Sequence, residues 1–136
     1  MMRRLRVFVV AIAVAGALAA CSSTTGYSDL DRAATPDDVL PGAVAEDGSD
    51  NLDLDSIRYV GRHDGRSFYL AQGEPQPGVC LAIYLDAESW VVGCGDVDVT
   101  VGGIGVTATV IRDGDVVPEG GTLVGHNVVV LQSSGS

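Results

Sequence analysis

The centre of the chain reads Gly78-Val-Cys-Leu-Ala-Ile-Tyr-Leu-Asp-Ala-Glu-Ser-Trp-Val-Val-Gly-Cys-Gly95. Two runs of strand-forming residues flank a short polar turn, and each run carries one cysteine. If residues 86–88 form the turn, Tyr84 lies opposite Trp90 and Cys80 lies opposite Cys94. Directly opposed residues at a non-hydrogen-bonded site bring their Cβ atoms close enough for a disulfide. The stretch therefore predicts an antiparallel hairpin that is cross-linked by Cys80 and Cys94.

The two cysteines could instead form a redox pair, or a zinc site completed by His63 and His126. Thirteen residues separate the cysteines, which is neither the close spacing of a redox Cys-x-x-Cys motif nor that of a zinc knuckle. We therefore expect a structural disulfide, which requires an oxidising compartment outside the cytoplasm. In the chain-entropy model a loop of this size contributes about 3 kcal/mol.

The N-terminus, residues 1–20, has the three parts of an export signal. Three arginines precede an apolar run of 12 residues, Val7 to Leu18. This run is too short to span a bilayer permanently, which takes about 20 residues. The arginine pair at positions 3–4 is a feature of twin-arginine export signals, but the residues after it favour general secretion.

The segment Leu18-Ala19-Ala20-Cys21 resembles the lipobox of bacterial lipoproteins at all four positions. The resemblance implies that Cys21 receives a diacylglycerol and becomes the mature N-terminus. The protein would then be a lipoprotein of the cell membrane, anchored on its extracytoplasmic face, with the membrane as its first partner. The alternatives are an ordinary signal peptide with a chance cysteine, and an uncleaved anchor.

Residues 21–51 lack a regular apolar period and are rich in acidic and small polar residues. They predict a flexible acidic tether that would place the domain roughly 30 Å from the anchor. One short helix is expected within it, at residues 35–40, because Pro36 suits a first helical position and two acids follow.

Residues 52–132 show alternating, strand-like patterns, and residues 133–136 form a frayed tail. The Asp64-Gly65 dipeptide predicts a hairpin turn in which Val60 lies opposite Tyr69. That register would put four apolar side chains on one face: Ile57, Tyr59, Phe68 and Leu70. Asp113-Gly114 predicts another hairpin, running into Val116-Val117. With six to eight short strands, we expect an all-β antiparallel domain, either a sandwich or a partly closed barrel.

Charge excludes one class of partner. After residue 20 the chain has five basic and 18 acidic residues, which gives this part a net charge of −13. So acidic a surface argues against binding nucleic acid. The sequence indicates no cofactor, and no catalytic motif such as a Gly-x-Ser-x-Gly elbow or a phosphate loop occurs. The pairs Asp96/Asp98 and Asp113/Asp115 could contribute to a calcium site, but such spacings are common in turns, and we expect no metal.

The domain resembles small actinobacterial lipoproteins and secreted proteins of unknown activity over about residues 52–131. The resemblance is carried by four stretches: 58–65, 68–71, 78–81 and 90–95. It implies no activity. We therefore expect a non-enzymatic module that binds an envelope protein or a wall component.

The alternative is a small hydrolase or ligand carrier. It would need a pocket that holds at least two of a set of five residues: His63, Asp64, Asp96, Asp98 and His126.

Overall fold

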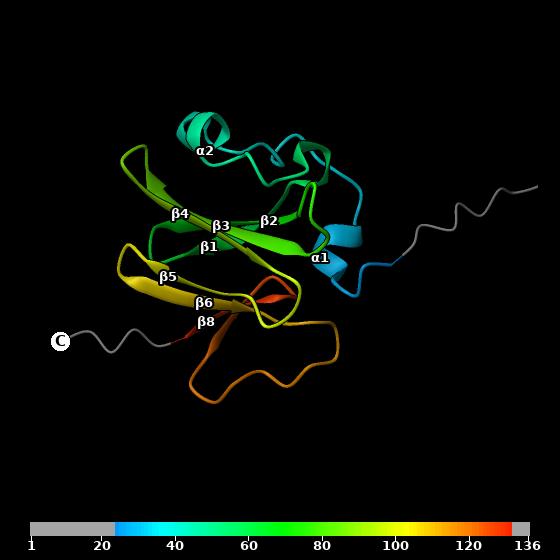
Figure 1. The fold of residues 1–136 in the computed structure, drawn as a ribbon. Helices are drawn as coiled ribbons and strands as arrows, with labels where there is room; N and C mark the ends of the chain where they lie inside the picture. The colour runs from blue at the N-terminus through cyan, green and yellow to red at the C-terminus, as the bar shows by residue number, and fades with distance from the viewer. Residues whose placement is uncertain (1–23, 132–136) are drawn as a thin grey trace, which may run out of the picture.

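The computed structural model describes residues 24–131, which form two antiparallel four-stranded sheets packed face to face (Figure 1). The first sheet has the order β1-β2-β3-β4, with bounds Arg58–His63, Arg66–Gln72, Val79–Asp86 and Ser89–Gly95. The second has the order β5-β6-β8-β7, with bounds Thr100–Gly103, Val106–Val110, Val128–Leu131 and Thr122–Val124. The predicted all-β fold is confirmed as a sandwich of two separate sheets rather than a closed barrel.

Alternate residues of the two inner faces form the main core. The first sheet contributes Phe68, Leu70, Val79, Leu81 and Ile83, and the second contributes Val101, Val106, Ala108, Val110, Val124, Val128 and Val130. Strand side chains alternate between faces, so these positions follow from the period of two in each strand. Gly93 lies at a close approach between the sheets, because a Cβ there would come within 2.7 Å of the Val101 side chain.

The central hairpin has the predicted register. Tyr84 lies opposite Trp90, and Cys80 lies opposite Cys94. The two cysteines form a disulfide with an S–S distance of 2.04 Å and a Cα–Cα distance of 4.1 Å, as expected for the narrow, non-hydrogen-bonded site of an antiparallel pair. The predicted disulfide is therefore confirmed. The turn itself is tighter than expected, because the register shifts after Tyr84 and pairs Asp86 with Ser89.

The first hairpin keeps its predicted register only near the turn. Gly61 lies opposite Phe68 as expected, but a β-bulge then pairs Tyr59 with Tyr69. One extra residue in a strand sends every later side chain to the opposite face. The predicted shared face of Ile57, Tyr59, Phe68 and Leu70 is therefore wrong. Tyr59 instead packs edge-on against Tyr69, with ring centroids 5.4 Å apart.

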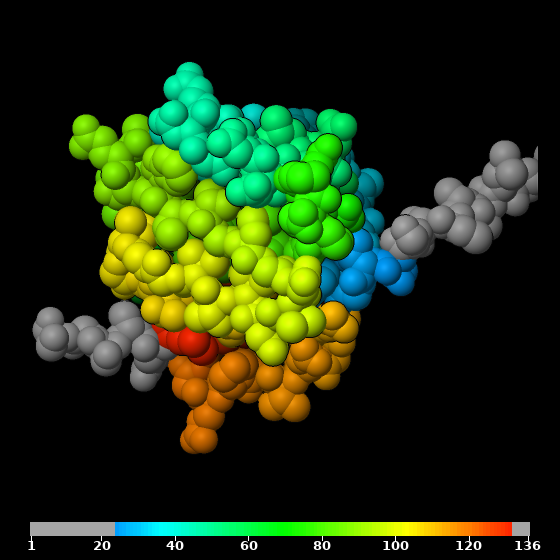
Figure 2. All heavy atoms as spheres, viewed as in Figure 1, coloured from blue at the N-terminus to red at the C-terminus, as the bar shows by residue number. Residues whose placement is uncertain are grey.

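The segment from Thr24 to Ile57, which we call the belt, wraps around the sandwich. It contains the helices α1 (Ser28–Asp31) and α2 (Gly42–Asp47) and the 3₁₀ turn η1 (Leu54–Ser56). Its second half covers the outer face of the first sheet, where belt and sheet residues form a second apolar cluster: Leu40, Val44, Leu52, Ile57, Tyr69, Ala71, Cys80 and Ala82. Figure 2 shows the α2 region forming the upper surface of the domain. The prediction of a flexible tether is therefore wrong for residues 24–51, and the domain begins well before residue 52.

Two smaller predictions also differ from the structure. Residues 35–40 form a turn at Pro36-Asp37 rather than a helix, and the Asp38 N–H closes this turn by donating to the Thr35 carbonyl at 3.0 Å. Asp113-Gly114 is a turn, but residues 115–120 form an exposed loop in place of a strand, with Val116 89% exposed. The expected export signal, Cys21 and the tail at 133–136 lie outside the described residues. Neither helix between residues 24 and 131 is long and apolar enough to cross a membrane.

Candidate functional site

Two carboxylates fix the belt to the sandwich, and the first belongs to Asp29 on α1. Its Oδ2 accepts hydrogen bonds from the backbone N–H groups of His126 (2.8 Å) and Asn127 (2.9 Å). In return, Asn127 Oδ1 accepts from the Asp29 N–H at 2.9 Å. The Asn127 amide also donates to the Ile111 carbonyl and to Asp113. Because Asp29 and Asn127 are buried, this reciprocal network ties α1 firmly to the β7–β8 turn.

The second carboxylate belongs to Asp38, whose side chain is only 2% exposed. Arg32 donates to both of its oxygens, at 2.6 and 2.8 Å, and the backbone N–H groups of Thr35 and Tyr59 donate at 2.6 and 2.7 Å. The bond from Arg32 and these two N–H groups hold the pKa of the Asp38 carboxyl well below its usual range. The same bond raises the pKa of Arg32. The belt therefore carries a charged pair that lies against the edge of β1.

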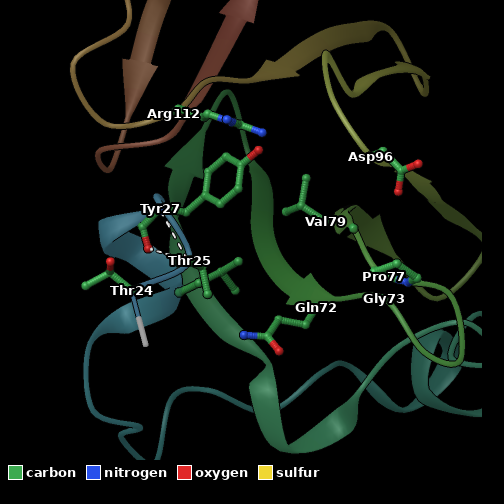
Figure 3. A pocket seen from close by; sticks show the side chains of 11 residues that line it. Thr24, Thr25, Tyr27, Gln72, Gly73, Pro77, Val79, Asp96 and Arg112 are labelled. Carbon is green, nitrogen blue, oxygen red and sulfur yellow. Dashed lines mark hydrogen bonds between the residues drawn. The ribbon is translucent and has the colours of Figure 1, made fainter. Parts of the chain in front are cut away.

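The contact between α1 and the β7–β8 turn also places residues 24–27. They form one wall of a cleft of about 400 Å³ (Figure 3). We call it the α1 cleft. Its lining comes from the belt, from the β2–β3 connection and from the loops after β4 and β6: Thr24, Thr25, Tyr27, Leu30, Gln72, Gly73, Pro77, Gly78, Val79, Asp96 and Arg112. The volume lies in the range of small-molecule sites.

The α1 cleft holds one positive and one negative side chain. In Figure 3, Arg112 and Tyr27 project from the same side, with the Tyr27 hydroxyl directed towards the guanidinium, and Asp96 lies on the facing side. Among the described residues no ion pair joins Arg112 to Asp96. Hydrogen bonds between Thr25 and the Tyr27 backbone, at 3.1 and 3.3 Å, fix the wall next to them. The cleft therefore offers a donor group and a carboxylate that are both free for a ligand.

A second cleft of about 340 Å³ lies next to the first, along the loop of residues 73–78. The two share Gly73, Pro77, Gly78 and Asp96, and the second adds the side chains of Asn51, Glu74, Gln76 and Cys94. The loop between them is closed by a bond from the Gly73 N–H to the Gly78 carbonyl at 3.0 Å. Gly78 has φ +139° and lies against Gly95, which leaves no room for a Cβ. The two clefts adjoin at these shared residues, along a loop with a defined backbone, and together we call them the furrow.

A third cleft, of about 480 Å³, lies between the end of α2 and β4. Its side chains include Asp47, Asp50, Asn51 and Trp90. The Trp90 ring packs against Gly48, where a Cβ would come within 2.6 Å of it. Both acids are exposed, so this cleft is a shallow acidic surface with one aromatic ring.

The candidate residues of the alternative function lie in separate places. His63 and Asp64 lie together at the β1–β2 turn, with Nε2 and Oδ2 3.3 Å apart. His126 lies in the β7–β8 turn, and Asp98 is exposed after β4. Asp96 lines two of the three clefts, but none of the other four residues lines any of them. The structure therefore does not bring two of the five together in these clefts.

The carboxylates considered for calcium are also dispersed. Asp96 belongs to the α1 cleft, whereas Asp113 is engaged by Asn127 and by the Ser28 N–H. These two hydrogen bonds lower the pKa of Asp113. Within residues 24–131, no three His, Cys, Asp or Glu side chains gather in a way that could hold a metal ion.

Sequence reasoning missed the residues that build the α1 cleft, above all Tyr27, Arg112 and Gln72. Tyr27 offered a signal, because it is the sole aromatic residue between positions 21 and 58, and disordered segments contain few aromatic residues. It is buried in the main core. Arg112 and Gln72 carried no comparable signal, since Gln72 ends a strand, Arg112 follows one, and both positions look like ordinary solvent-exposed ones.

Comparison with known proteins assigns no family and no activity. No protein-family model matches the chain, and no curated protein and no solved structure shows significant similarity to it. The site must therefore be interpreted from its own geometry.

Proposed function

We propose that the protein is a lipoprotein anchored through Cys21 on the extracytoplasmic face of the cell membrane. Its β domain serves as a non-enzymatic binding module of the cell envelope, with an envelope protein or a wall component as partner. The observation that carries the proposal is the short distance along the chain from the lipobox cysteine to the start of the belt. Cys21 lies three residues before Thr24, which already lines the α1 cleft.

The fixed belt changes how such an anchor would act. Three residues span at most about 10 Å, whereas a free tether to residue 51 would reach roughly 30 Å. An anchored domain would thus sit next to the bilayer surface, with the α1 cleft on the side of the anchor. Its partner would be met close to the membrane.

The Cys80–Cys94 disulfide supports a location outside the cytoplasm, because disulfides form and persist in oxidising compartments. The charge of the domain supports a partner other than nucleic acid. All 18 acidic residues follow the signal segment, against five arginines, and such a surface repels phosphate backbones.

The second candidate is a ligand carrier, and it is favoured by the α1 cleft itself. A volume of about 400 Å³ with unpaired polar groups fits a small molecule. A hydrolase receives less support, because the clefts contain one residue of the five that were expected to form its site.

Two experiments test the proposal. Cells fed a labelled fatty acid should transfer label to the wild-type chain and not to Cys21→Ser, while Ser22→Ala serves as the matched control and keeps the label. Label on the Cys21→Ser variant, or none on the wild type, would refute the anchor.

Photo-crosslinking in intact cells, from a probe placed at Gln76 on the rim of the furrow, should recover an envelope protein or wall fragment. A probe at Leu123, an exposed position on β7, serves as the control and should not recover it. Turnover of ester or wall-type substrates by the purified protein would contradict the non-enzymatic role.

A further inference from the structure

We propose that the furrow formed by the α1 cleft and its neighbour binds a free amino acid or a short peptide through its two terminal charges. Arg112 takes the carboxylate and Asp96 takes the ammonium group. This inference deepens the proposed function and rests on it for the location of the ligand. Three features of the furrow support this assignment: the Arg112 guanidinium, the Asp96 carboxylate and the amide side chains.

The first feature is the guanidinium of Arg112. Arg32, Arg58 and Arg66 all donate side-chain hydrogen bonds to carboxylate or carbonyl oxygens of the domain. Within residues 24–131, Arg112 makes hydrogen bonds through its backbone alone, although the chain is strongly acidic. Its planar fork of N–H groups matches a carboxylate. The Tyr27 hydroxyl is directed to the same place (Figure 3) and adds a donor.

The second feature is Asp96 on the facing side. Asp38 and Asp29 use their carboxylates to fix the belt, but no described residue donates a hydrogen bond to the Asp96 side chain. Asp96 lines both halves of the furrow. A ligand that carries only a negative charge would meet this carboxylate as a repulsive group. A zwitterion would satisfy both walls at once.

The third feature distinguishes a peptide from a lipid headgroup, which can also be zwitterionic. Gln72 lies in the α1 cleft, and Gln76 and Asn51 lie in the second cleft. Each amide side chain offers both a donor and an acceptor, which suits the alternating N–H and C=O groups of a peptide. The second cleft extends the furrow beyond Asp96, which gives room for the second residue of a short peptide.

Dialanine, with both ends free, is the probe for the full chain purified in detergent. Broadening of its methyl NMR signals on titration reports binding. Dialanine amide lacks the carboxylate and acetyl-dialanine lacks the ammonium group. We expect the amide to bind at least about tenfold more weakly than dialanine, because a charge-assisted bidentate pair is lost. The acetylated peptide should also bind several-fold more weakly.

Substitutions of Arg112 and Asp96 test which residue binds the carboxylate of dialanine and which binds its ammonium group. In Arg112→Gln, dialanine and its amide should bind equally weakly, and in Asp96→Asn, dialanine and acetyl-dialanine should bind alike. Arg62→Gln is the matched control, since Arg62 is exposed on β1 and lies outside the furrow. It removes the same charge and should leave dialanine binding unchanged. The unfolding temperature of each variant checks that it folds, and the modified peptides test the wild-type protein even if a variant does not.

The assignment would be overturned by no binding of dialanine, by equal binding of dialanine and its amide, or by the same loss in Arg62→Gln as in Arg112→Gln. Glycerophosphoethanolamine serves as a soluble model of a zwitterionic lipid headgroup. If it binds in preference to dialanine, the peptide assignment is also overturned. If crosslinking in cells recovers a partner but the purified protein does not bind dialanine, the peptide site is refuted and the proposed function still stands.

Discussion

The carboxylate of Asp38 accepts a hydrogen bond from the backbone N–H of Tyr59 at 2.7 Å. Arg32, which is paired with Asp38, donates to the carbonyl of the same Tyr59 at 2.8 Å. Tyr59 lies on β1, an edge strand of the first sheet, and its outward N–H and C=O would otherwise be open to another strand. A charged side-chain pair from the belt therefore satisfies the backbone groups that a neighbouring strand would otherwise bond. It protects this edge from pairing with a strand of another chain.

Replacing Asp38 with Asn should destabilise the domain. The neutral amide cannot keep the charge-assisted bonds from Arg32, and it presents an N–H₂ group where two acceptors are needed. Hydrogen bonds to charged groups contribute about 1.5–3 kcal/mol each, so we expect the free energy of unfolding to fall by about 2–3 kcal/mol in urea titrations at pH 7. Asp37→Asn is the control, because Asp37 is exposed next to it. Equal effects of the two substitutions would contradict this role of Asp38.

Acid should weaken the same contact. The pKa of Asp38 is lower in the folded protein than in the unfolded chain, so its contribution is fully present above the unfolded value of about 3.9. It is lost as the pH falls from there through the folded pKa. The unfolding free energy of the wild type should therefore drop more steeply below about pH 4 than that of Asp38→Asn. Parallel pH profiles of the two proteins would show that Asp38 is not the group responsible.

Asn127→Ala should release α1 from the β7–β8 turn. The substitution removes the acceptor of the Asp29 N–H, at a buried site, and the donor to the Ile111 carbonyl, at a partly buried one. We expect a loss of about 2–3 kcal/mol, measured by urea unfolding. His126→Ala changes the neighbouring exposed side chain and keeps the backbone N–H bonded to Asp29. It should stay within about 0.5 kcal/mol of the wild type.

Loss of the disulfide should cost about 3 kcal/mol, the value expected for a loop closed by two cysteines with a sequence separation of 14. The double variant Cys80→Ala/Cys94→Ala tests this by urea unfolding. Reductant should lower the stability of the wild type and leave the double variant unchanged. A non-reducing peptide map of the protein isolated from cells that found both cysteines free would contradict the cross-link.

The central hairpin was predictable because two independent features specify one register. The cysteine pair and the Tyr84–Trp90 pair both require residues 80–84 to oppose 90–94, and the structure has this pairing. The first hairpin had one local signal, the Asp64-Gly65 turn. That signal gave the pairing as far as Gly61, but it could not place the bulge that follows. Tyr59 turns to the outer face because the belt supplies apolar contacts and two hydrogen bonds there.

The belt was missed because its apolar residues are widely spaced and follow no helical or strand period. The signal for it lay elsewhere, in the run of residues 79–83. All five are buried, so β3 is covered on both faces, and continuous apolar strands are typical of that situation. Something outside the predicted sheets had to cover the second face, and residues 24–57 were the remaining candidate. The α1 cleft could not be predicted, because it depends on where the belt docks.

Val44 distinguishes a docked belt from a tether most directly. Its side chain is 0% exposed at the centre of α2, where it packs in the second apolar cluster, whereas Val39 is 68% exposed. Removing two buried methyl groups costs about 0.8 kcal/mol each in transfer free energy, and the cavity that remains adds to the loss. We therefore expect Val44→Ala to lower the unfolding free energy by about 2 kcal/mol, measured by urea titration. Val39→Ala should change it by less than about 0.5 kcal/mol. A flexible tether would give the same small effect at both positions, so equal stability of the two variants would contradict the docked belt and, with it, the wall of the α1 cleft that Thr24, Thr25 and Tyr27 provide.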